Sequence, residues 1–133
     1  MLTWDFERTK YGGLPKFLGI TRDSIDSINS KLDKALESDM LITSAGVSKG
    51  DYDLVKTVLE SRGNMAFWSV KMRPAKPLAF GLLNTSNRSK VPHIGLPGNP
   101  VSAMVAFEEF CRPAILKMLG QDTLTRKHVT AIL

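Results

Sequence analysis

The clearest pattern along the chain is a set of segments in which apolar residues recur every three or four positions. Residues 23–37, 51–62 and 100–119 show this spacing, which is typical of a helix with one buried face. A weaker pattern in residues 1–11 predicts one more amphipathic helix. The apolar positions of the first two segments are Ile25, Ile28, Leu32, Ala35 and Leu36, followed by Leu54, Val55, Val58 and Leu59.

Residues that begin or end helices stand at the borders of these segments. Asp23 is a good N-cap for the first helix, because its carboxylate can accept a backbone N–H. Gly63 and Gly120 are expected to end the second and third helices. Pro113 lies inside the third pattern and predicts a kink there, because proline removes a helical hydrogen bond.

Short apolar runs lie between the helical patterns and predict β-strands. They cover residues 14–20, 40–43, 65–72, 78–83 and 91–96, and residues 128–133 resemble the opening of a further strand. The run 40–43 has no charged interruption, as in strands buried in parallel sheets. Strands that alternate with helices predict an α/β fold, with a mostly parallel sheet and helices on both faces.

Two loops follow the carboxyl ends of predicted strands, where ligands of such sheets bind. The later loop lies within Gly95-Leu96-Pro97-Gly98-Asn99-Pro100-Val101-Ser102. Asn99 suits the N-cap of the following helix and Pro100 its first position. Gly98 has no Cβ, so the backbone there can approach a ligand closely. The free N–H groups of the helix start would then face an anion.

The earlier loop, residues 44–52, is rich in small residues that leave room for a ligand. Hydroxyl and N–H groups of Ser44, Gly46 and Ser48 could cradle a phosphate or a polar heterocycle. Asp51 is interpreted as a helix cap that complements the helix dipole. For Asp53 two interpretations stay open, the same dipole role or the binding of a cation or heterocycle.

Composition and charge favour a globular domain with an anionic ligand. The chain has 133 residues, of which 43% are hydrophobic and 23% charged, and its net charge is +5. Residues 56–90 hold seven basic side chains and only one acid, which suits a phosphate-bearing ligand or simply a solvated surface. Nucleic acid is not expected, because the basic residues lack an aromatic frame or a known binding motif.

The cysteine and histidine content argues against an internal disulfide and against a site with cysteine or histidine metal ligands. The single cysteine, Cys111, cannot form an internal disulfide or a zinc cluster, and it is interpreted as a small core residue. His93 and His128 are isolated and have no metal-ligand spacing. No apolar run reaches the length of a membrane span and no signal peptide opens the chain, so we expect no membrane partner and a cytoplasmic location.

Three motifs together resemble the MoeA/gephyrin E-domain family, the molybdopterin molybdenumtransferases. Residues 44–53, Ser-Ala-Gly-Val-Ser-Lys-Gly-Asp-Tyr-Asp, resemble the family motif S-G-G-V-S-x-G-x-x-D. Residues 72–77, Met-Arg-Pro-Ala-Lys-Pro, resemble M-K-P-G-K-P, and residues 95–102 match G-L-P-G-N-P-V-S without change. The chain departs from these motifs at Ala45 and Ala75, which replace glycine, and at Arg73, which replaces lysine.

The resemblance implies a fold and a division of the chain. The expected fold is the three-layer α/β/α molybdopterin-binding domain, which is MogA-like. Residues 1–120 would form this domain without its first strand, and residues 121–133 would begin the family's C-terminal β domain. The chain is therefore expected to be truncated at both ends, and inactive by itself.

The resemblance also implies the chemistry, which is insertion of molybdate into adenylylated molybdopterin with release of AMP. Molybdopterin and molybdate would be substrates, and Mg²⁺ would assist. Cations and N–H donors are needed where an oxyanion and a phosphate meet, and Mg²⁺ prefers carboxylate oxygens.

The family roles are carried to individual positions of this chain. Catalytic roles are implied for Asp53, Asp23, Arg73 and Lys76, with Asp53 and Asp23 as the ligands of Mg²⁺. For Asp23 the N-cap interpretation stays open beside this one. Binding of the pterin cofactor is implied for Ser44, Gly46, Val47, Ser48, Gly50, Pro97, Gly98, Asn99, Pro100 and Ser102.

Two other functions are kept as alternatives. The first is a MogA-like molybdopterin adenylyltransferase, which shares the fold and would consume ATP. The second is a non-catalytic scaffold domain of the gephyrin type. For the main interpretation, the resemblance implies a homodimer of the full-length protein and a molybdopterin adenylyltransferase as the pathway partner.

Overall fold

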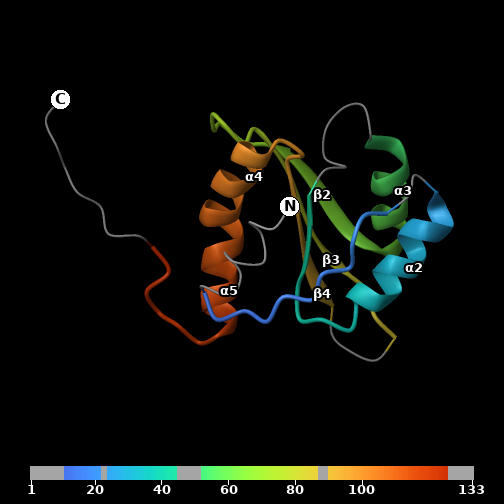
Figure 1. Cartoon of the computed structure of the whole chain (residues 1–133), viewed down its shortest axis with the longest axis horizontal. Helices are drawn as coiled ribbons and strands as arrows, with labels where there is room; N and C mark the ends of the chain where they lie inside the picture. Colours follow the sequence, from blue (N-terminus) through green and yellow to red (C-terminus); the bar gives the residue numbers. More distant parts are fainter. Residues whose placement is uncertain (1–10, 22–23, 45–51, 87–89, 126–133) are drawn as a thin grey trace, which may run out of the picture.

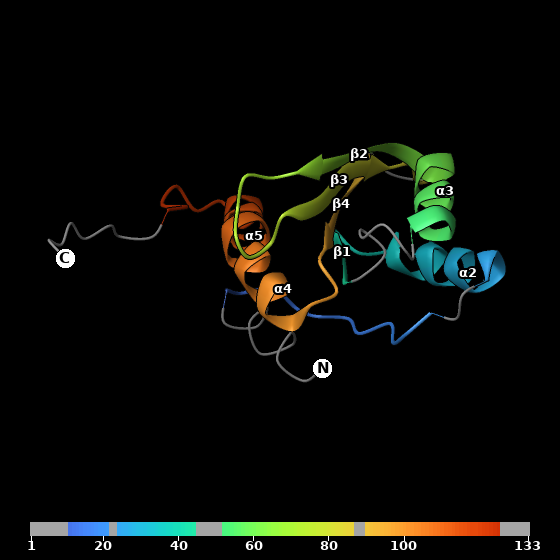
Figure 2. The same ribbon diagram turned by 90° about the horizontal axis from the view of Figure 1, so that it is seen from above.

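The computed structural model describes residues 11–21, 24–44, 52–86 and 90–125, and the side chains of Tyr52 and Asp53 lie outside this description. Within these residues, helices cover both faces of one four-stranded sheet (Figures 1 and 2). The predicted helix 1–11 and the predicted strand 128–133 fall almost wholly outside the described residues. The elements in chain order are α2 (Ile25–Ala35), β1 (Leu41–Ser44), α3 (Tyr52–Arg62), β2 (Gly63–Ser69), β3 (Pro77–Leu83), β4 (Val91–Leu96), α4 (Pro100–Ala106), the π-helical turn η1 (Phe107–Cys111) and α5 (Arg112–Met118).

The sheet is mixed, with the strand order β1-β4-β3-β2. β1 and β4 pair in parallel, whereas β3 is antiparallel to both β4 and β2. The prediction of a mostly parallel sheet is therefore wrong for the described strands. The physical reason is the length of the connections: residues 70–76 and 84–90 are too few for the crossover of about a dozen residues that a parallel pair requires.

Each face of the sheet has its own hydrophobic core. On one face, Ile94 and Leu96 of β4 pack against the C-terminal helix, which consists of α4, η1 and α5. The residues of this helix in the core include Ala103, Phe107 and Cys111. The buried position of Cys111 confirms its interpretation as a core residue. On the other face, Leu83 of β3 packs with residues of α2 and α3, namely Ile28, Leu32, Val58 and Leu59. These two cores give the layered α/β/α arrangement that Figure 2 shows.

Helices α2 and α3 form the layer over the second face. α2 begins one residue later than predicted, because Ser24 and not Asp23 is its N-cap, with the Ser24 hydroxyl accepting from the N–H of Ser27. Arg62, the last residue of α3, joins the two helices. Its Nε donates to Asn29 Oδ1 at 3.1 Å, and its Nη2 lies 2.9 Å from Asp33 Oδ1.

The C-terminal helix is interrupted where the sequence predicts a kink. Before Pro113, the backbone passes through the π-helical turn η1, in which the N–H of Arg112 bonds to the carbonyl of Phe107. Pro113 has no N–H to donate to the preceding turn, and a π-turn adjusts the helix around that missing bond. Gly120 ends the helix with a φ of 76°, as predicted.

The predicted strand at residues 14–20 is wrong. This segment, drawn in blue along one side of the molecule in Figure 2, has no regular secondary structure. Leu14, Phe17 and Ile20 are exposed. Its apolar run is broken by Pro15, which cannot donate a ladder hydrogen bond, and by Gly19 at a φ of 72°.

No helix among the described residues combines the length and the apolar character that crossing a membrane would require.

The sheet buries one histidine, His93 of β4, completely. The pairing of Leu83 with Val91 places His93 on the same face as Leu83, over the apolar layer of α2 and α3. Its Nε2 lies 3.0 Å from Thr43 Oγ1, and its Nδ1 has no hydrogen-bond partner. Burial therefore lowers the pKa of His93 from its ordinary 6.5 to about 4.

We expect this pKa to make the fold acid-sensitive. The folded pKa lies below the unfolded one, so the contribution of neutral His93 is complete above pH 6.5 and is lost as the pH falls towards 4. The loss in the free energy of unfolding is about 3 kcal/mol over that range. His93→Leu should remove this component, which urea unfolding of both proteins between pH 7 and pH 4 measures. If the free energy of unfolding depended on pH equally in the two proteins, His93 would not be the source of the acid sensitivity.

We expect the close approach of β2 and β3 to exclude side chains at two glycines. A Cβ on Gly63 would lie 2.8 Å from Leu83 Cα, and one on Gly81 would lie 2.9 Å from Met65 Cα, with backbone atoms closer still. Gly63→Ala and Gly81→Ala should each lower the free energy of unfolding by about 2 kcal/mol or more, because backbone must move. Ser69→Ala, at an exposed position of β2, is the control and should change it little. Denaturant unfolding measures all three, and tolerance of both glycine variants would show that the strands separate easily.

Candidate functional site

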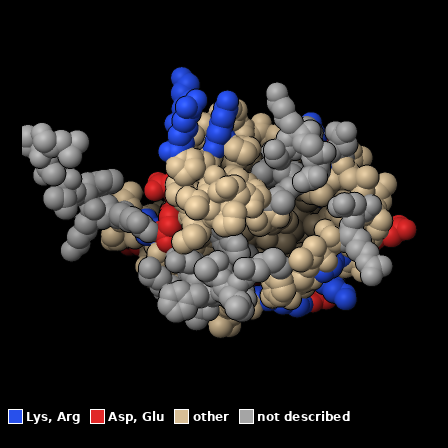
Figure 3. All heavy atoms as spheres, turned by 45° about the horizontal axis from the view of Figure 1, so that its top comes forward, with Lys and Arg blue, Asp and Glu red and all other residues tan. Residues whose placement is uncertain are grey.

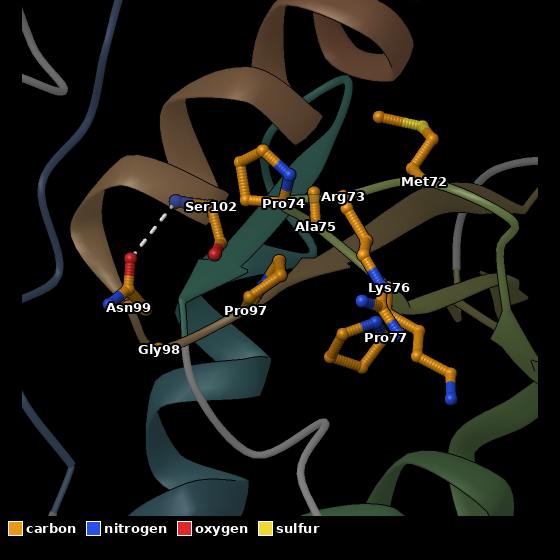
Figure 4. Close-up of a pocket in the computed structure, with 10 residues that line it drawn as sticks. All are labelled: Met72, Arg73, Pro74, Ala75, Lys76, Pro77, Pro97, Gly98, Asn99 and Ser102. Carbon is orange, nitrogen blue, oxygen red and sulfur yellow. Dashed lines mark hydrogen bonds between the residues drawn. The ribbon is translucent and has the colours of Figure 1, made fainter.

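Two separate segments of the chain line one pocket of about 430 Å³. The first is the β2–β3 connection with the start of β3, and the second is the turn between β4 and α4. Figure 4 shows the two segments facing each other across the pocket. The lining residues are Met72, Arg73, Pro74, Ala75, Lys76, Pro77, Pro97, Gly98, Asn99 and Ser102.

The turn from β4 into α4 has the geometry predicted from its sequence. Asn99 is extended and caps the helix, because its Oδ1 accepts from the N–H of Ser102 at 3.1 Å (Figure 4). Pro100 is the first helical residue, where its missing N–H has no consequence. Pro97 is buried while Gly98 and Asn99 are exposed, so the turn is anchored on one side and open to solvent on the other.

The β2–β3 connection is anchored in the core through Ala75. This residue is 3% exposed and packs with Leu78 and Ile94, although its φ of 78° lies in the region that favours glycine. The N–H of Val70 donates to the carbonyl of Lys76 at 2.7 Å and closes the connection. With Ala75 held inside, Arg73 and Lys76 on either side of it are exposed.

The pocket has a positively charged side. Basic side chains project from the end of the molecule where the β2–β3 connection lies (Figure 3). In Figure 4, Arg73 and Lys76 extend in the same direction, away from Asn99. Neither forms an ion pair with an acid of the described residues. An anion in the pocket would therefore meet two cations without displacing a described carboxylate.

The end of β1 lies beside this pocket. The hydroxyl of Ser44 donates to the carbonyl of Pro97 at 3.5 Å, a long contact between residues 53 positions apart in the sequence. The parallel pairing of Ser44 with Leu96 accounts for this closeness. The two loops that the sequence places at carboxyl ends of strands therefore begin at the same edge of the sheet.

The structure brings together part of the predicted site. Arg73, Lys76 and the turn residues Pro97, Gly98, Asn99 and Ser102 line the pocket, Pro100 begins the adjoining helix, and Ser44 contacts Pro97. Asp53 belongs to the first turn of α3, but its side chain is not described. The remaining predicted residues lie outside the described residues, namely Asp23, Gly46, Val47, Ser48 and Gly50.

The apolar wall of the pocket was not predicted from the sequence. Met72, Pro74, Ala75 and Pro77 line it, although only the two cations of their segment were predicted as site residues. The signal was the pair of prolines around Ala75, which restricts the backbone and gives flat apolar surfaces. The pocket thus combines cations and a hydroxyl with apolar walls, which suits a ligand that has a charged group and an uncharged ring.

Among the residues that the structure describes, no three acids, histidines or cysteines gather as a metal site would require. The two carboxylates predicted for Mg²⁺ belong to Asp23, outside the description, and to Asp53, whose side chain is outside it. The Mg²⁺ site therefore stays a prediction.

The chain is similar to molybdopterin molybdenumtransferases and to gephyrin. Over 97 residues the chain is 46% identical to the molybdopterin molybdenumtransferase of Haemophilus influenzae, covering 72% of this chain and 23% of that protein. It is 39% identical to the gephyrin of Dictyostelium discoideum over 115 residues, covering 77% of this chain and 16% of that protein. The chain thus spans a quarter or less of the length of these two relatives.

A solved structure agrees with this result. The molybdopterin biosynthesis MoeA protein of Pyrococcus horikosii superposes with a TM-score of 0.75 at 28% identity, covering 91% of this chain and 29% of that one. Residues 7–117 match the protein family described as "Probable molybdopterin binding domain". This match covers most of the chain and includes the whole described pocket. The chain belongs to the molybdopterin-binding domain family of molybdenum cofactor biosynthesis, with MoeA and gephyrin among its relatives.

Proposed function

We propose that this chain is the pterin-binding part of a molybdopterin molybdenumtransferase. The reaction is insertion of molybdate into adenylylated molybdopterin, with release of AMP. In this proposal the turn 97–102 and the segment 72–77 hold the anionic end of the pterin and the incoming molybdate. Turnover is proposed to require more of the protein than these 133 residues, because the relative from Haemophilus influenzae that carries this activity in its name is about three times as long.

One observation carries the proposal: segments 72–77 and 97–102 line a single pocket. They contribute unlike groups to it. Arg73 and Lys76 supply positive charge, Ser102 supplies a hydroxyl, and the prolines supply apolar surface. A phosphate and a molybdate both carry negative charge, so bringing them together requires fixed donors and cations nearby.

Mg²⁺ is part of the proposal because its expected ligands have the right chemistry. Asp23 and Asp53 are carboxylates, the oxygen ligands that Mg²⁺ prefers, and two such ligands suit an ion that keeps several waters. When bound, the ion would supply positive charge against the phosphate of the pterin. The homodimer, the adenylyltransferase partner and the division of the chain after residue 120 are likewise proposals.

We expect molybdate binding to depend on the two pocket cations. Arg73→Ala and Lys76→Ala should each weaken molybdate binding about fivefold at low ionic strength, because each removes one charge from the pocket. Lys71→Ala is the matched control, since Lys71 is exposed on the same connection but does not line the pocket. Isothermal titration of the 133-residue chain with sodium molybdate measures all three. If Lys71→Ala weakened molybdate binding as much as the other two variants, the effect would come from the net charge of the protein and not from the pocket, which would contradict the prediction.

We expect Asp53 to be required for turnover in the whole protein that carries this chain. With adenylylated molybdopterin, molybdate and Mg²⁺, Asp53→Asn should lower AMP release at least about a hundredfold, as expected when a ligand of an essential ion is lost. Asp26→Asn, at an exposed acid of α2, is the control and should retain full activity. Full AMP release by Asp53→Asn would contradict the role of Asp53. ATP consumption with molybdopterin would instead favour the adenylyltransferase alternative.

A further inference from the structure

His93 is a buried polar residue that hydrophobic packing alone does not explain. It is fully buried within the sheet, and its Nδ1 has neither a hydrogen-bond partner nor contact with solvent. A buried polar atom without a partner costs about 1–3 kcal/mol. A leucine of similar volume would fill the same space without this penalty. The imidazole is therefore expected to do something that an apolar side chain cannot do.

The hydrogen bond of His93 to Thr43 is the property that distinguishes it. Nε2 of His93 lies 3.0 Å from Oγ1 of Thr43. In the neutral ring one nitrogen carries a proton and the other a lone pair. The tautomer protonated at Nε2 donates to Thr43 and leaves a lone pair at Nδ1. This arrangement is less costly than an N–H group buried without an acceptor.

The strand register gives this bond its direction. His93 is paired with Leu41 across the parallel β1–β4 ladder, whereas Thr43 is paired with Gly95. The bond thus runs diagonally, from His93 to a residue two positions further along β1. Gly95 has no side chain opposite Thr43, so the imidazole has a free path to the hydroxyl. The bond links the two strands just before both reach the candidate site.

Each of the two strands leads from this hydrogen bond towards the candidate site. Ser44 comes directly after Thr43, and its hydroxyl contacts the carbonyl of Pro97. Pro97 lies four residues after His93 and lines the pocket. A shift of Thr43 relative to β4 would therefore change the distance between Ser44 and the turn 97–102.

We propose that His93 is a positioning residue, whose hydrogen bond to Thr43 fixes the end of β1 against β4 and so sets the place of Ser44 beside the pocket. The part of this proposal that concerns binding of molybdate and pterin rests on the proposed function. The part that concerns the position of the β1 backbone does not depend on it. The free-energy cost of the unpaired Nδ1 then follows from placing a polar pair inside an apolar layer. Such a loss of stability is found where stability and function compete.

The test replaces both partners with apolar residues of similar shape. In the 133-residue chain, Thr43→Val with His93→Leu removes the bond and leaves no polar atom unpaired. The thermal unfolding midpoint at pH 7 should then be unchanged or higher. Amide hydrogen exchange over residues 41–44, followed by mass spectrometry, should nevertheless be at least about tenfold faster, because local opening of β1 becomes easier. A purely structural role for His93 predicts the opposite, a lower midpoint with exchange that changes evenly over the sheet.

Two further variants serve as controls. Thr43→Ser keeps the hydroxyl and should keep slow exchange at residues 41–44. Val58→Ala opens a cavity in the same layer without touching the pair, and should lower the midpoint and speed exchange across the sheet together. Unchanged exchange at residues 41–44 in the double variant, or faster exchange in Thr43→Ser, would overturn the proposal.

A binding measurement separates this proposal from the proposed function. Titrated with sodium molybdate, the double variant should bind about fivefold more weakly than the unaltered chain, because Ser44 is displaced. If the unaltered chain binds no molybdate, the proposed function fails, while the exchange experiment still decides the positioning role. If the unaltered chain binds and the double variant binds equally well, the positioning role at the site is wrong.

Discussion

The parallel pairing of β1 with β4 is the constraint on which the candidate site depends. It brings together residues that are 53 positions apart in the sequence, so that Ser44 contacts Pro97. The rest of the site follows from this edge. β3 lies next to β4, and its connection to β2 carries the cations to the pocket wall. One edge of the sheet thus brings together Ser44, the capped start of α4 and the basic β2–β3 connection.

Two buried residues of the sheet and its connections depart from local preference. Ala75 has a φ that favours glycine, and His93 buries a nitrogen without a partner. Several helix ends follow ordinary rules: Ser24 and Asn99 cap helices, and Gly120 ends one. The departure at Ala75, which lines the pocket, is of the kind that a binding site is expected to show, because the geometry of such a site is set by the ligand as well as by packing.

Much of the local structure could be predicted because it depends on short-range chemistry. The strand 91–96 and the turn from Asn99 to Pro100 are confirmed, since capping and proline geometry act within a few residues. The sheet direction could not be predicted from alternation alone, because it depends on connection lengths. The strand predicted at 14–20 is absent because Pro15 cannot donate a ladder hydrogen bond and Gly19 has a positive φ, effects that the apolar pattern by itself does not show.

The candidate site could be predicted only in part, for a similar reason. Arg73, Lys76 and the residues after Leu96 were predicted from their motifs, whereas the link between His93 and Thr43 depends on strand register. A crystal structure of the chain with bound adenylylated molybdopterin would test this arrangement of the site directly. The phosphates should lie between the segments 72–77 and 97–102, within hydrogen-bonding distance of Ser102 and of Arg73 or Lys76. A pterin bound at another face, with this pocket empty, would contradict it.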